Sequence, residues 1–363
     1  MGTGPEPQTK QSVVQTRNDI LRHQEMQEKS EKTISYSRLE VIGAGAWGTS
    51  LALTAARAGH PVRLWAREKE VVDSMSARRE NKLFLPGVEL PASIEATGDL
   101  RSAVTGAEAL LIAAPTQHLR VLLEAVAGLA PEGIPLVVCA KGIERISGKL
   151  VTEVFCEAAP GFEPAILSGP SFAKDAALGL PTAVTIAARF DIAQRLQATL
   201  SHATFRPYAS DDLIGVALGG AAKNVYAIAC GIVDGMGLGE SARAALLTRG
   251  FAELARLGLA LGAKTETLMG LSGLGDLVLT ATSPHSRNFR FGREIGRGRN
   301  IAELRAPGQP LVEGDETAAA LVIRARAEKI ELPVAEAVAS VLDGSLPLDA
   351  TIARLMSRPL KPE

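Results

Sequence analysis

The chain has 363 residues, enough for two domains of ordinary size, and 46% of them are hydrophobic, so a sizeable core can form. The formal net charge of −1 argues against a nucleic-acid partner, and no apolar run approaches the roughly 18 residues that a membrane-spanning helix needs. Three widely spaced cysteines and five scattered histidines exclude a disulfide framework and a metal cluster. These features favour a cytoplasmic protein without a resident metal.

Residues 1–36 differ from the rest, because Gln, Glu, Lys, Arg and Ser dominate and apolar residues are few. This composition predicts a disordered or loosely helical tail. Its acidic residues argue against a transit peptide, and a secretory apolar core is missing.

The next segment has the pattern of a dinucleotide-binding turn. An apolar run predicts a strand over Leu39–Ile42, the glycines Gly43, Gly45 and Gly48 follow, and a helix is predicted over Thr49–Ala58. Gly43 would make the tight turn, Gly45 would let backbone approach a pyrophosphate, and Gly48 would let helix and strand pack closely. Glycines also mark ordinary turns, but this context favours a bound NAD or NADP on the helix N-terminus.

From there to residue 209, apolar runs alternate with helical patterns, which is typical of an α/β Rossmann-type, doubly wound sheet. Further strands are predicted at Pro61–Trp65, Ala109–Ala114, Pro135–Ala140, Ala165–Ser168, Thr182–Ala187 and Thr204–Tyr208. The rest of the chain has helical patterns only. The predicted organisation is a tail over 1–36, an NAD(P)-binding domain over 37–209 and an all-α domain over 210–363.

The tip of the second predicted strand bears on the choice of cofactor. NAD-specific sites usually place an acidic residue there, on the ribose 2′-OH. This chain has Arg67 instead, which could meet the 2′-phosphate of NADP, although Glu68 and Glu70 follow. A solvated loop charge explains Arg67 equally well, so the sequence leaves NAD and NADP open.

Two polar signatures interrupt the apolar second half. Lys223 lies in a stretch rich in Gly and Ala, where a buried lysine would have a lowered pKa and suit a general acid or base. The alternative is a helix lysine that reaches solvent. Further on, Asp276 follows a run of glycines, and Ser286, Arg287 and Asn288 are consecutive donors in a predicted loop, as a phosphate monoester requires. Taken alone, either segment could be an ordinary turn, because Gly, Ser, Asn and Asp are common in turns.

Together these motifs resemble the bacterial NAD(P)-dependent sn-glycerol-3-phosphate dehydrogenases over about residues 38–355. The strings that carry the resemblance are Gly43–Gly48, Asn81–Gly87, Ala113–Thr116, Ala140–Glu144, Ser168–Ala173, Lys223–Asn224, Gly273–Leu277, Ser286–Asn288 and Leu311–Gly314. One departure is Phe84, which stands where a tyrosine is usual.

The resemblance implies reversible, NAD(P)H-dependent reduction of dihydroxyacetone phosphate to sn-glycerol 3-phosphate, supplying glycerophospholipid synthesis, by an enzyme that is usually a homodimer. It implies that Lys223 is the proton donor or acceptor and that Asp276 is its catalytic partner. The implied substrate contacts are Lys141, Gly169, Ser171, Lys223, Asn224 and Asp276, with Ser286, Arg287 and Asn288 at the phosphate. The implied cofactor contacts are Gly43, Gly45, Ala46, Trp47, Gly48, Arg67, Phe84, Lys141, Ala173, Arg287, Leu311 and Glu313.

Two other classes of protein remain as alternatives. β-Hydroxyacid dehydrogenases also join a Rossmann domain to a helical domain with a catalytic lysine, but they typically have an asparagine four residues after it and bind a carboxylate. Here Asn224 is adjacent to Lys223. A redox sensor that binds NADP(H) without turnover would not need Lys223, Asp276 and Arg287 together.

Overall fold

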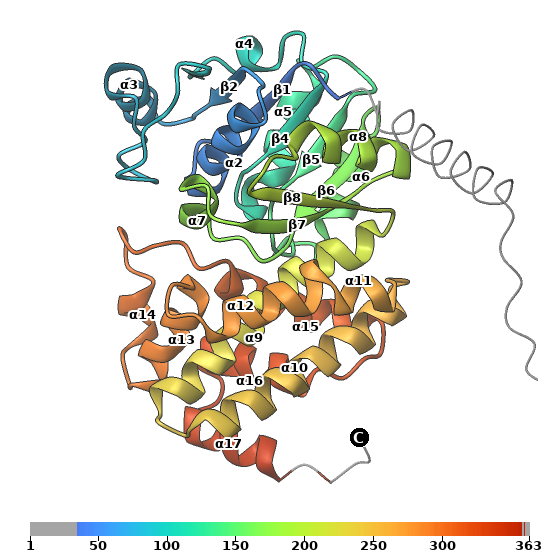
Figure 1. Cartoon of the computed structure of the whole chain (residues 1–363). Helices are drawn as coiled ribbons and strands as arrows, with labels where there is room; N and C mark the ends of the chain where they lie inside the picture. The colour runs from blue at the N-terminus through green and yellow to red at the C-terminus, as the bar shows by residue number, and fades with distance from the viewer. Residues whose placement is uncertain (1–34, 358, 360–363) are drawn as a thin grey trace, which may run out of the picture. The chain divides into compact units, whose positions relative to one another are not determined.

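The computed structural model describes residues 35–357 and 359, so the predicted tail lies outside the described residues except at its last two positions. A single sheet is followed along the chain by helices (Figure 1). The strands are β1 (Leu39–Ile42), β2 (Val62–Trp65), β3 (Ile94–Thr97), β4 (Ala109–Ile112), β5 (Pro135–Val138), β6 (Glu163–Ser168), β7 (Thr182–Ala187) and β8 (Phe205–Ser210).

The strand order is β3-β2-β1-β4-β5-β6-β7-β8. Neighbours run parallel except β6 and β7, which pair antiparallel with Leu167 opposite Ile186. The chain reverses its direction across the sheet between β1 and β4. In Rossmann-type sheets the ligand lies at the carboxyl ends of the strands at this switch point. The predicted fold class is therefore confirmed.

Several strand bounds differ from the predicted ones. The predicted strands at Ala109–Ala114 and Pro135–Ala140 end earlier, at Ile112 and Val138, because the chain there leaves the sheet for loops. Strand β3 was not predicted, since only Ile94 of its four residues is buried and no two-sided apolar run marks it. The first helix begins at Ala46 rather than Thr49, because the glycine turn leads into it directly.

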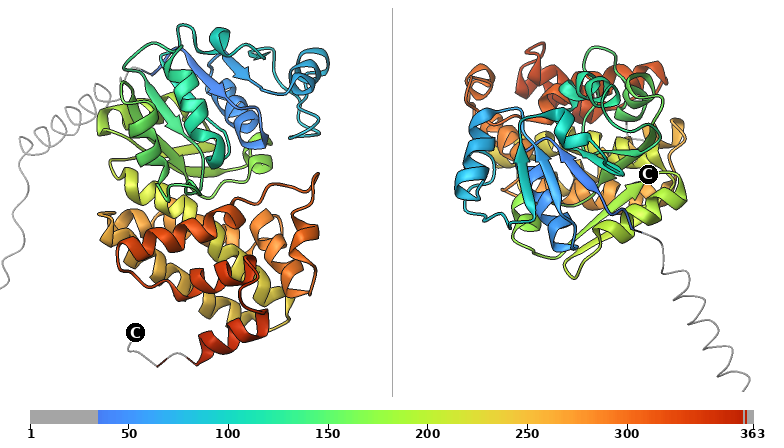
Figure 2. Two further views of the ribbon diagram at one scale, coloured as in Figure 1. Left: turned by 180° about the vertical axis from the view of Figure 1, so that it is seen from behind. Right: turned by 90° about the horizontal axis from the view of Figure 1, so that it is seen from above.

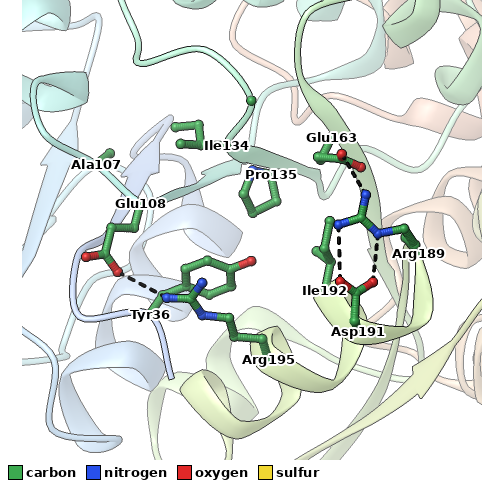
Figure 3. A pocket seen from close by; sticks show the side chains of 11 residues that line it. Tyr36, Ala107, Glu108, Ile134, Pro135, Glu163, Arg189, Asp191, Ile192 and Arg195 are labelled. Carbon is green, nitrogen blue, oxygen red and sulfur yellow. Dashed lines mark hydrogen bonds and ion pairs between the residues drawn. The ribbon is translucent and has the colours of Figure 1, made fainter. Parts of the chain in front are cut away.

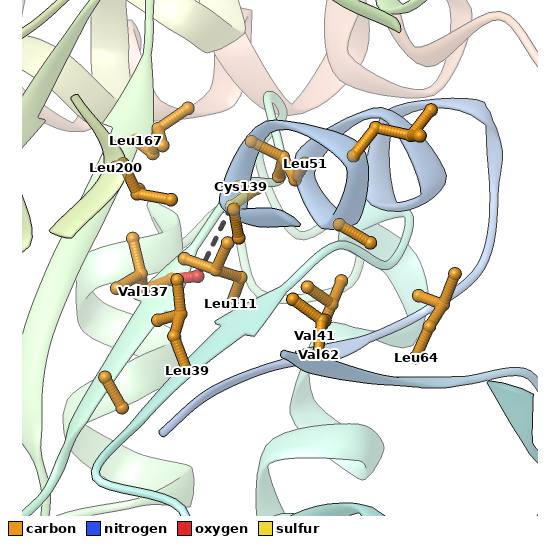
Figure 4. Packing of buried hydrophobic residues seen from close by; sticks show 14 of the residues in the cluster. Leu39, Val41, Leu51, Val62, Leu64, Leu111, Val137, Cys139, Leu167 and Leu200 are labelled. Carbon is orange, nitrogen blue, oxygen red and sulfur yellow. Dashed lines mark hydrogen bonds between the residues drawn. The ribbon is translucent and has the colours of Figure 1, made fainter. Parts of the chain in front are cut away.

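Alternate residues of the central strands point to opposite faces, and each face has its own core. Leu39 and Val41 of β1 belong to one apolar cluster, together with Leu51 and Leu200 from the helices that cover it (Figure 4). Ile42 belongs to the other cluster. Two-sided burial is the reason that these strands appear as continuous apolar runs in the sequence.

Helices cover both faces of the sheet, as the views from behind and from above show (Figure 2). They are α2 (Ala46–Arg57), α3 (Lys69–Arg78), α4 (Leu100–Val104), the 3₁₀ turn η1 (Thr116–His118), α5 (Leu119–Ala127), α6 (Val151–Ala158), α7 (Ala173–Ala177) and α8 (Phe190–Leu200). Helices α2 and α8 contribute to the first cluster, and α5 and α6 to the second.

The rest of the described chain forms the helical domain. Its elements are α9 (Leu213–Gly235), α10 (Glu240–Ala260), α11 (Thr265–Met269), the π-helical turn η2 (Leu271–Gly275), α12 (Asp276–Thr282), α13 (Arg287–Gly296), α14 (Ile301–Leu304), α15 (Glu313–Ala327), α16 (Pro333–Leu342) and α17 (Leu348–Met356). The predicted boundary between 209 and 210 stays a prediction. The last strand ends at Ser210, and Asp212 caps α9 by accepting from the Gly215 N–H.

Helix α9 is the core of the helical domain, because every residue from Gly215 to Ile232 is buried. By length and composition it could cross a membrane, which the sequence reading had not anticipated, but 94% of its most apolar window is buried inside the protein. Its apolar character therefore serves packing.

Helix α13 packs on α9 backbone to backbone. A Cβ added at Gly231 would lie 2.1 Å from the carbonyl oxygen of Phe289, and one at Gly292 would lie 2.1 Å from that of Ile228. One turn further along, Gly235 and Gly296 show the same close approach. No larger residue fits at these four positions without a shift of the helices.

Candidate active site

The glycine turn between β1 and α2 has the geometry of an anion-binding loop. Gly43 adopts a φ of +111°, and a Cβ there would lie 2.6 Å from the carbonyl oxygen of Ala113. A Cβ on Gly48 would lie 1.7 Å from the Gly43 carbonyl oxygen, so α2 packs directly on the turn. Gly45 is the N-cap of α2, and apart from its chain neighbours no atom of the described chain lies within 4 Å of its Cβ position. Phosphate could approach the uncapped N–H groups here.

A buried donor beside this turn also lacks a partner. Trp47, in the first turn of α2, has its indole Nε1 buried without a hydrogen bond to any described residue. The Lys141 Nζ lies 6.0 Å from the centroid of the Trp47 ring. Buried donors are normally paired, so this one fits a ligand that brings an acceptor. The open helix terminus, the three glycines and the unpaired donor together fit NAD or NADP.

Arg67 lies at the tip of β2, as predicted, but it has a partner of its own. Its Nε and one terminal nitrogen donate to Glu68 Oε1 at 3.0 and 2.7 Å. The Arg67 side chain is 70% exposed. A contact with a 2′-phosphate stays a prediction, and it would have to compete with Glu68.

The centre of the candidate site is a buried carboxylate that two lysines share. Asp276 Oδ1 lies 2.5 Å from Lys223 Nζ, and its Oδ2 lies 2.9 Å from Lys141 Nζ. Asp276 is 1% exposed and Lys223 is 6% exposed. Lys141 Nζ also donates to the carbonyl oxygen of Gly169 at 3.0 Å. The alternative in which Lys223 reaches solvent is therefore wrong.

Thr280 completes this cluster, and the sequence reading assigned it no role. Its hydroxyl lies 3.0 Å from Lys223 Nζ and 3.2 Å from Asp276 Oδ1. Asp276 and Thr280 are four residues apart on α12, so they lie on the same face of that helix. That spacing is the signal that could have identified Thr280.

The surroundings shift the pKa values of both charged partners. Burial, only partly offset by Asp276, lowers the pKa of Lys223 to about 8. Burial works to raise the pKa of the Asp276 carboxyl, but Lys141 and Lys223 hold it below its usual value. The cluster therefore holds an anion and two cations, and the lowered pKa of Lys223 makes its ammonium a better proton donor than that of an ordinary lysine.

Close packing at two glycines brings α9 together with η2 and with the end of β6. Lys223 lies on α9, and Asp276 directly follows the π-helical turn η2, a feature that often occurs at functional sites. A Cβ on Gly219 would lie 2.5 Å from the Ser272 carbonyl oxygen in η2. One on Gly220 would lie 2.7 Å from the hydroxyl of Ser168, at the end of β6. The two glycines before Lys223 thus let α9 approach both the sheet and η2.

The predicted phosphate-binding residues lie at the start of a helix, not in a loop as predicted. Ser286 is the buried N-cap of α13 and accepts from the Phe289 N–H, which makes this segment helical. Arg287 is exposed at the first position of the helix, and Asn288 follows, largely buried. The N-terminus of α13 thus adds helix N–H groups to the charge of Arg287.

Glu313 begins α15 and lies within electrostatic reach of the same cations. Burial raises the pKa of its carboxyl, against the nearby charges of Arg287 and Lys223. The structure therefore groups Lys141, Lys223, Asp276, Arg287 and Glu313 around one region.

The other predicted contacts lie at the edges of this region or at exposed positions. Gly169 follows β6, and Ser171 Oγ donates to its carbonyl oxygen at 3.0 Å. Ala173 begins α7. Phe84 and Leu311 are about two-fifths exposed, at 39% and 41%. Their contacts with substrate or cofactor stay predictions.

A pocket of about 380 Å³ lies elsewhere, at the amino-terminal ends of the strands (Figure 3). Its charges are paired: Arg189 with Glu163 and Asp191, and Arg195 with Glu108. The Arg195 guanidinium also lies 3.9 Å from the centroid of the Tyr36 ring. The pocket contains none of the predicted site residues, and its charges already have partners.

The sheet with its glycine turn and the helical domain with its buried lysine–aspartate pair define a two-domain, NAD(P)-dependent dehydrogenase. Family models described as the N-terminus and the C-terminus of NAD-dependent glycerol-3-phosphate dehydrogenase match residues 38–193 and 212–353. The chain therefore belongs to the NAD-dependent glycerol-3-phosphate dehydrogenase family, whose members are oxidoreductases.

Individual relatives agree. The chain is 54% identical over 332 residues to a glycerol-3-phosphate dehydrogenase (NAD(P)+) of Parvibaculum lavamentivorans, covering 91% of this chain and 99% of the relative. It is 51% identical to the enzyme of the same name from Rhodospirillum rubrum over 326 residues, which are 90% and 93% of the two chains. The crystal structure of glycerol-3-phosphate dehydrogenase from Coxiella burnetii superposes with a TM-score of 0.85 at 37% identity, covering 89% of this chain and 99% of that one.

Proposed function

We propose that the protein catalyses the reversible reduction of dihydroxyacetone phosphate to sn-glycerol 3-phosphate, with Lys223 as proton donor in the reduction and as acceptor in the oxidation. The observation that carries this proposal is the buried Lys223–Asp276 pair, with Nζ and Oδ1 2.5 Å apart. A lysine with a pKa of about 8 can exist in both protonation states near neutral pH, which both directions of the reaction require.

The residues divide the chemistry among them. The glycine turn at Gly43, Gly45 and Gly48 would hold NAD(P)H, which when bound would supply the hydride for the ketone carbon, and NAD(P)+ would accept that hydride in the oxidation. Lys223 gives a proton to the oxygen on which negative charge develops. Lys141 places a second cation beside it, where a preorganised positive charge stabilises the transition state. Asp276 holds both ammonium groups in position, and Thr280, on the same face of α12, also accepts from Lys223.

We place the substrate phosphate at the N-terminus of α13. Arg287 offers a planar fork of donors, and the first N–H groups of the helix add to it. Ser286 already accepts from the Phe289 N–H, so its hydroxyl hydrogen remains for a phosphate oxygen. Gly169 and Ser171 complete the substrate site on the side of the sheet.

The proposal extends to the setting of the reaction, with the family resemblance as its support. The protein acts as a cytoplasmic homodimer and supplies glycerophospholipid synthesis. The cofactor binds the domain predicted over 37–209, and the substrate and the catalytic residues belong to 210–363.

The decisive experiment is an assay of the full chain with NADPH and with NADH, following the absorbance of the reduced nicotinamide. We expect oxidation that depends on dihydroxyacetone phosphate, and reduction of NADP⁺ or NAD⁺ with sn-glycerol 3-phosphate. Dihydroxyacetone without its phosphate should be a poor substrate. Turnover of a β-hydroxyacid instead would favour that dehydrogenase class, and cofactor binding without turnover of any of these would favour a sensor.

A further inference from the structure

A chain of buried side-chain amides runs through the candidate site. Asn224 Nδ2 donates to the Lys141 carbonyl oxygen at 2.9 Å. Asn288 Nδ2 donates to Asn224 Oδ1 at 2.9 Å, and the Gly314 N–H donates to Asn288 Oδ1 at 2.9 Å. A carbonyl can only accept and an N–H can only donate, so the two ends of the chain fix the orientation of both amides.

Each link of this chain is next to a residue of the proposed site. Asn224 directly follows Lys223, and Asn288 follows Arg287. Gly314 follows Glu313, and at the other end the carbonyl belongs to Lys141 itself. The hydrogen bonds therefore join the loop after β5 to helices α9, α13 and α15, the segments that contain Lys141, Lys223, Arg287 and Glu313.

The hydrogen-bonded amides of this chain are buried and closely packed. Asn224 is 3% exposed and Asn288 is 9% exposed. A Cβ at Gly314 would lie 2.6 Å from the Asn224 carbonyl oxygen and 2.7 Å from Asn288 Oδ1. Buried amides are stable only when paired, so removal of one link leaves its neighbours unsatisfied and frees the segments to shift.

We propose that Asn224 and Asn288 act as positioning residues, which hold Lys141 in register with Lys223, Arg287 and Glu313. This inference rests on the proposed function and refines it. One N–H and the oxygen of the Asn288 side chain belong to this chain of hydrogen bonds, and its second N–H remains for the phosphate that Arg287 and the N–H groups of α13 also bind. The resemblance had assigned the Asn288 side chain to the phosphate itself.

The substrate without a phosphate separates the two roles. Asn288→Ala should lower kcat with dihydroxyacetone phosphate by about tenfold to a hundredfold, the range for a small misplacement of reacting groups. It should lower the turnover of dihydroxyacetone by a similar factor. A side chain that only bound phosphate would raise the KM for dihydroxyacetone phosphate and leave dihydroxyacetone unaffected, and that result would overturn the proposal. Asn300→Ala is the matched control, because Asn300 caps the short helix α14 at an exposed position.

A double-mutant cycle tests whether the two amides depend on each other, without relying on a single variant. Asn224→Asp keeps the size of the side chain but loses the donor to the Lys141 carbonyl. If the two amides act as one chain, combining it with Asn288→Ala should cost little more than the worse single change. Losses that multiply would overturn the proposal. Thermal melting identifies any variant that fails to fold, and Asn288→Ser then replaces Asn288→Ala.

A binding measurement keeps this test independent of turnover. Quenching of tryptophan fluorescence by NADPH measures cofactor binding, because Trp47 lies beside Lys141 and Trp65 ends β2 next to the glycine turn. We expect a several-fold weaker Kd in Asn288→Ala and no change in Asn300→Ala. An unchanged Kd in Asn288→Ala would contradict the link to Lys141. If the wild type bound NADPH but did not turn over dihydroxyacetone phosphate, the proposed function would fail, while the effect on Kd would still report on the amide chain.

Discussion

The two edges of the sheet both gather charged side chains, but only at one edge do two largely buried cations share one carboxylate. At the amino-terminal ends, the pocket of Figure 3 pairs Arg189 and Arg195 with three carboxylates. At the carboxyl ends, Lys141 and Lys223 share the single buried carboxylate of Asp276. A hollow with paired, half-exposed charges needs nothing more, whereas a buried excess of positive charge fits an anionic ligand. Buried cations that share one carboxylate, rather than the size of a cavity, are the feature that distinguishes the proposed active site.

The largest effect that follows from this contrast concerns Lys223. Lys223→Ala should lower turnover by about 10²–10⁴-fold, the usual contribution of general acid–base catalysis, with little change in NADPH affinity. Arg195→Met, at the opposite edge, removes a charge of the same sign and should leave turnover unchanged. Steady-state kinetics of both variants check this. Near-wild-type turnover of Lys223→Ala would remove Lys223 from the mechanism.

A smaller loss is expected when the phosphate site keeps its charge but loses its geometry. Arg287→Lys removes the planar fork, and charge-assisted hydrogen bonds contribute roughly 1.5–3 kcal/mol each. The KM for dihydroxyacetone phosphate should therefore rise more than tenfold. Dihydroxyacetone, which has no phosphate, should be affected far less. Equal losses with both substrates would mean that Arg287 serves the cofactor or the fold.

The pairing of Lys223 with Asp276 also predicts how the reaction rate depends on pH. Reduction needs the Lys223 ammonium, so its rate should be level at low pH and fall as the pH rises through about 8. Oxidation of glycerol 3-phosphate needs the free amine and should rise over the same range. In Asp276→Asn the carboxylate that favours the ammonium is lost, so the pKa of Lys223 should fall further. Both profiles should then move to lower pH, and pH–rate profiles in the two directions measure this.

The smallest effect is expected at the exposed tip of β2, where Arg67 is already paired. Arg67→Ala should raise the KM for NADPH a few-fold and leave that for NADH nearly unaltered. Glu68→Gln should have the opposite effect on NADPH, because it frees the guanidinium from its partner. Kinetics with both cofactors test this pair. Equal changes for NADPH and NADH would show that Arg67 does not recognise the 2′-phosphate.

The sequence predicted those elements whose conformation depends mainly on their own residues. The glycine turn at Gly43 and the central strands could be predicted, because a positive φ and two-sided burial each leave a direct mark in the sequence. Strand β3 at the sheet edge has one buried residue and leaves no such mark. The antiparallel β7 could not be distinguished, since buried strands have the same apolar composition in either direction.

The sequence identifies individual residues of the candidate site, but not the geometry in which they meet. Lys223 stood out as a charge in an apolar stretch. Its partner Asp276 is 53 positions away, and Lys141 lies 135 positions from Asp276, so only the tertiary fold shows that one carboxylate serves both lysines. Ser286 and Arg287 were expected in a loop, because serine is common both in turns and at helix N-caps.

The glycine contacts between α9 and α13 have a consequence for substrate choice. Lys223 lies on one of these helices and Arg287 on the other, and the backbone contact at Gly231 and Gly292 prevents the two helices from sliding. On the proposed assignment, the proton donor and the phosphate anchor are therefore fixed points on one rigid body. The distance between the two residues is then constant. We expect it to select ketones by the number of bonds between the carbonyl and the phosphate, and to exclude those whose phosphate is one carbon further away.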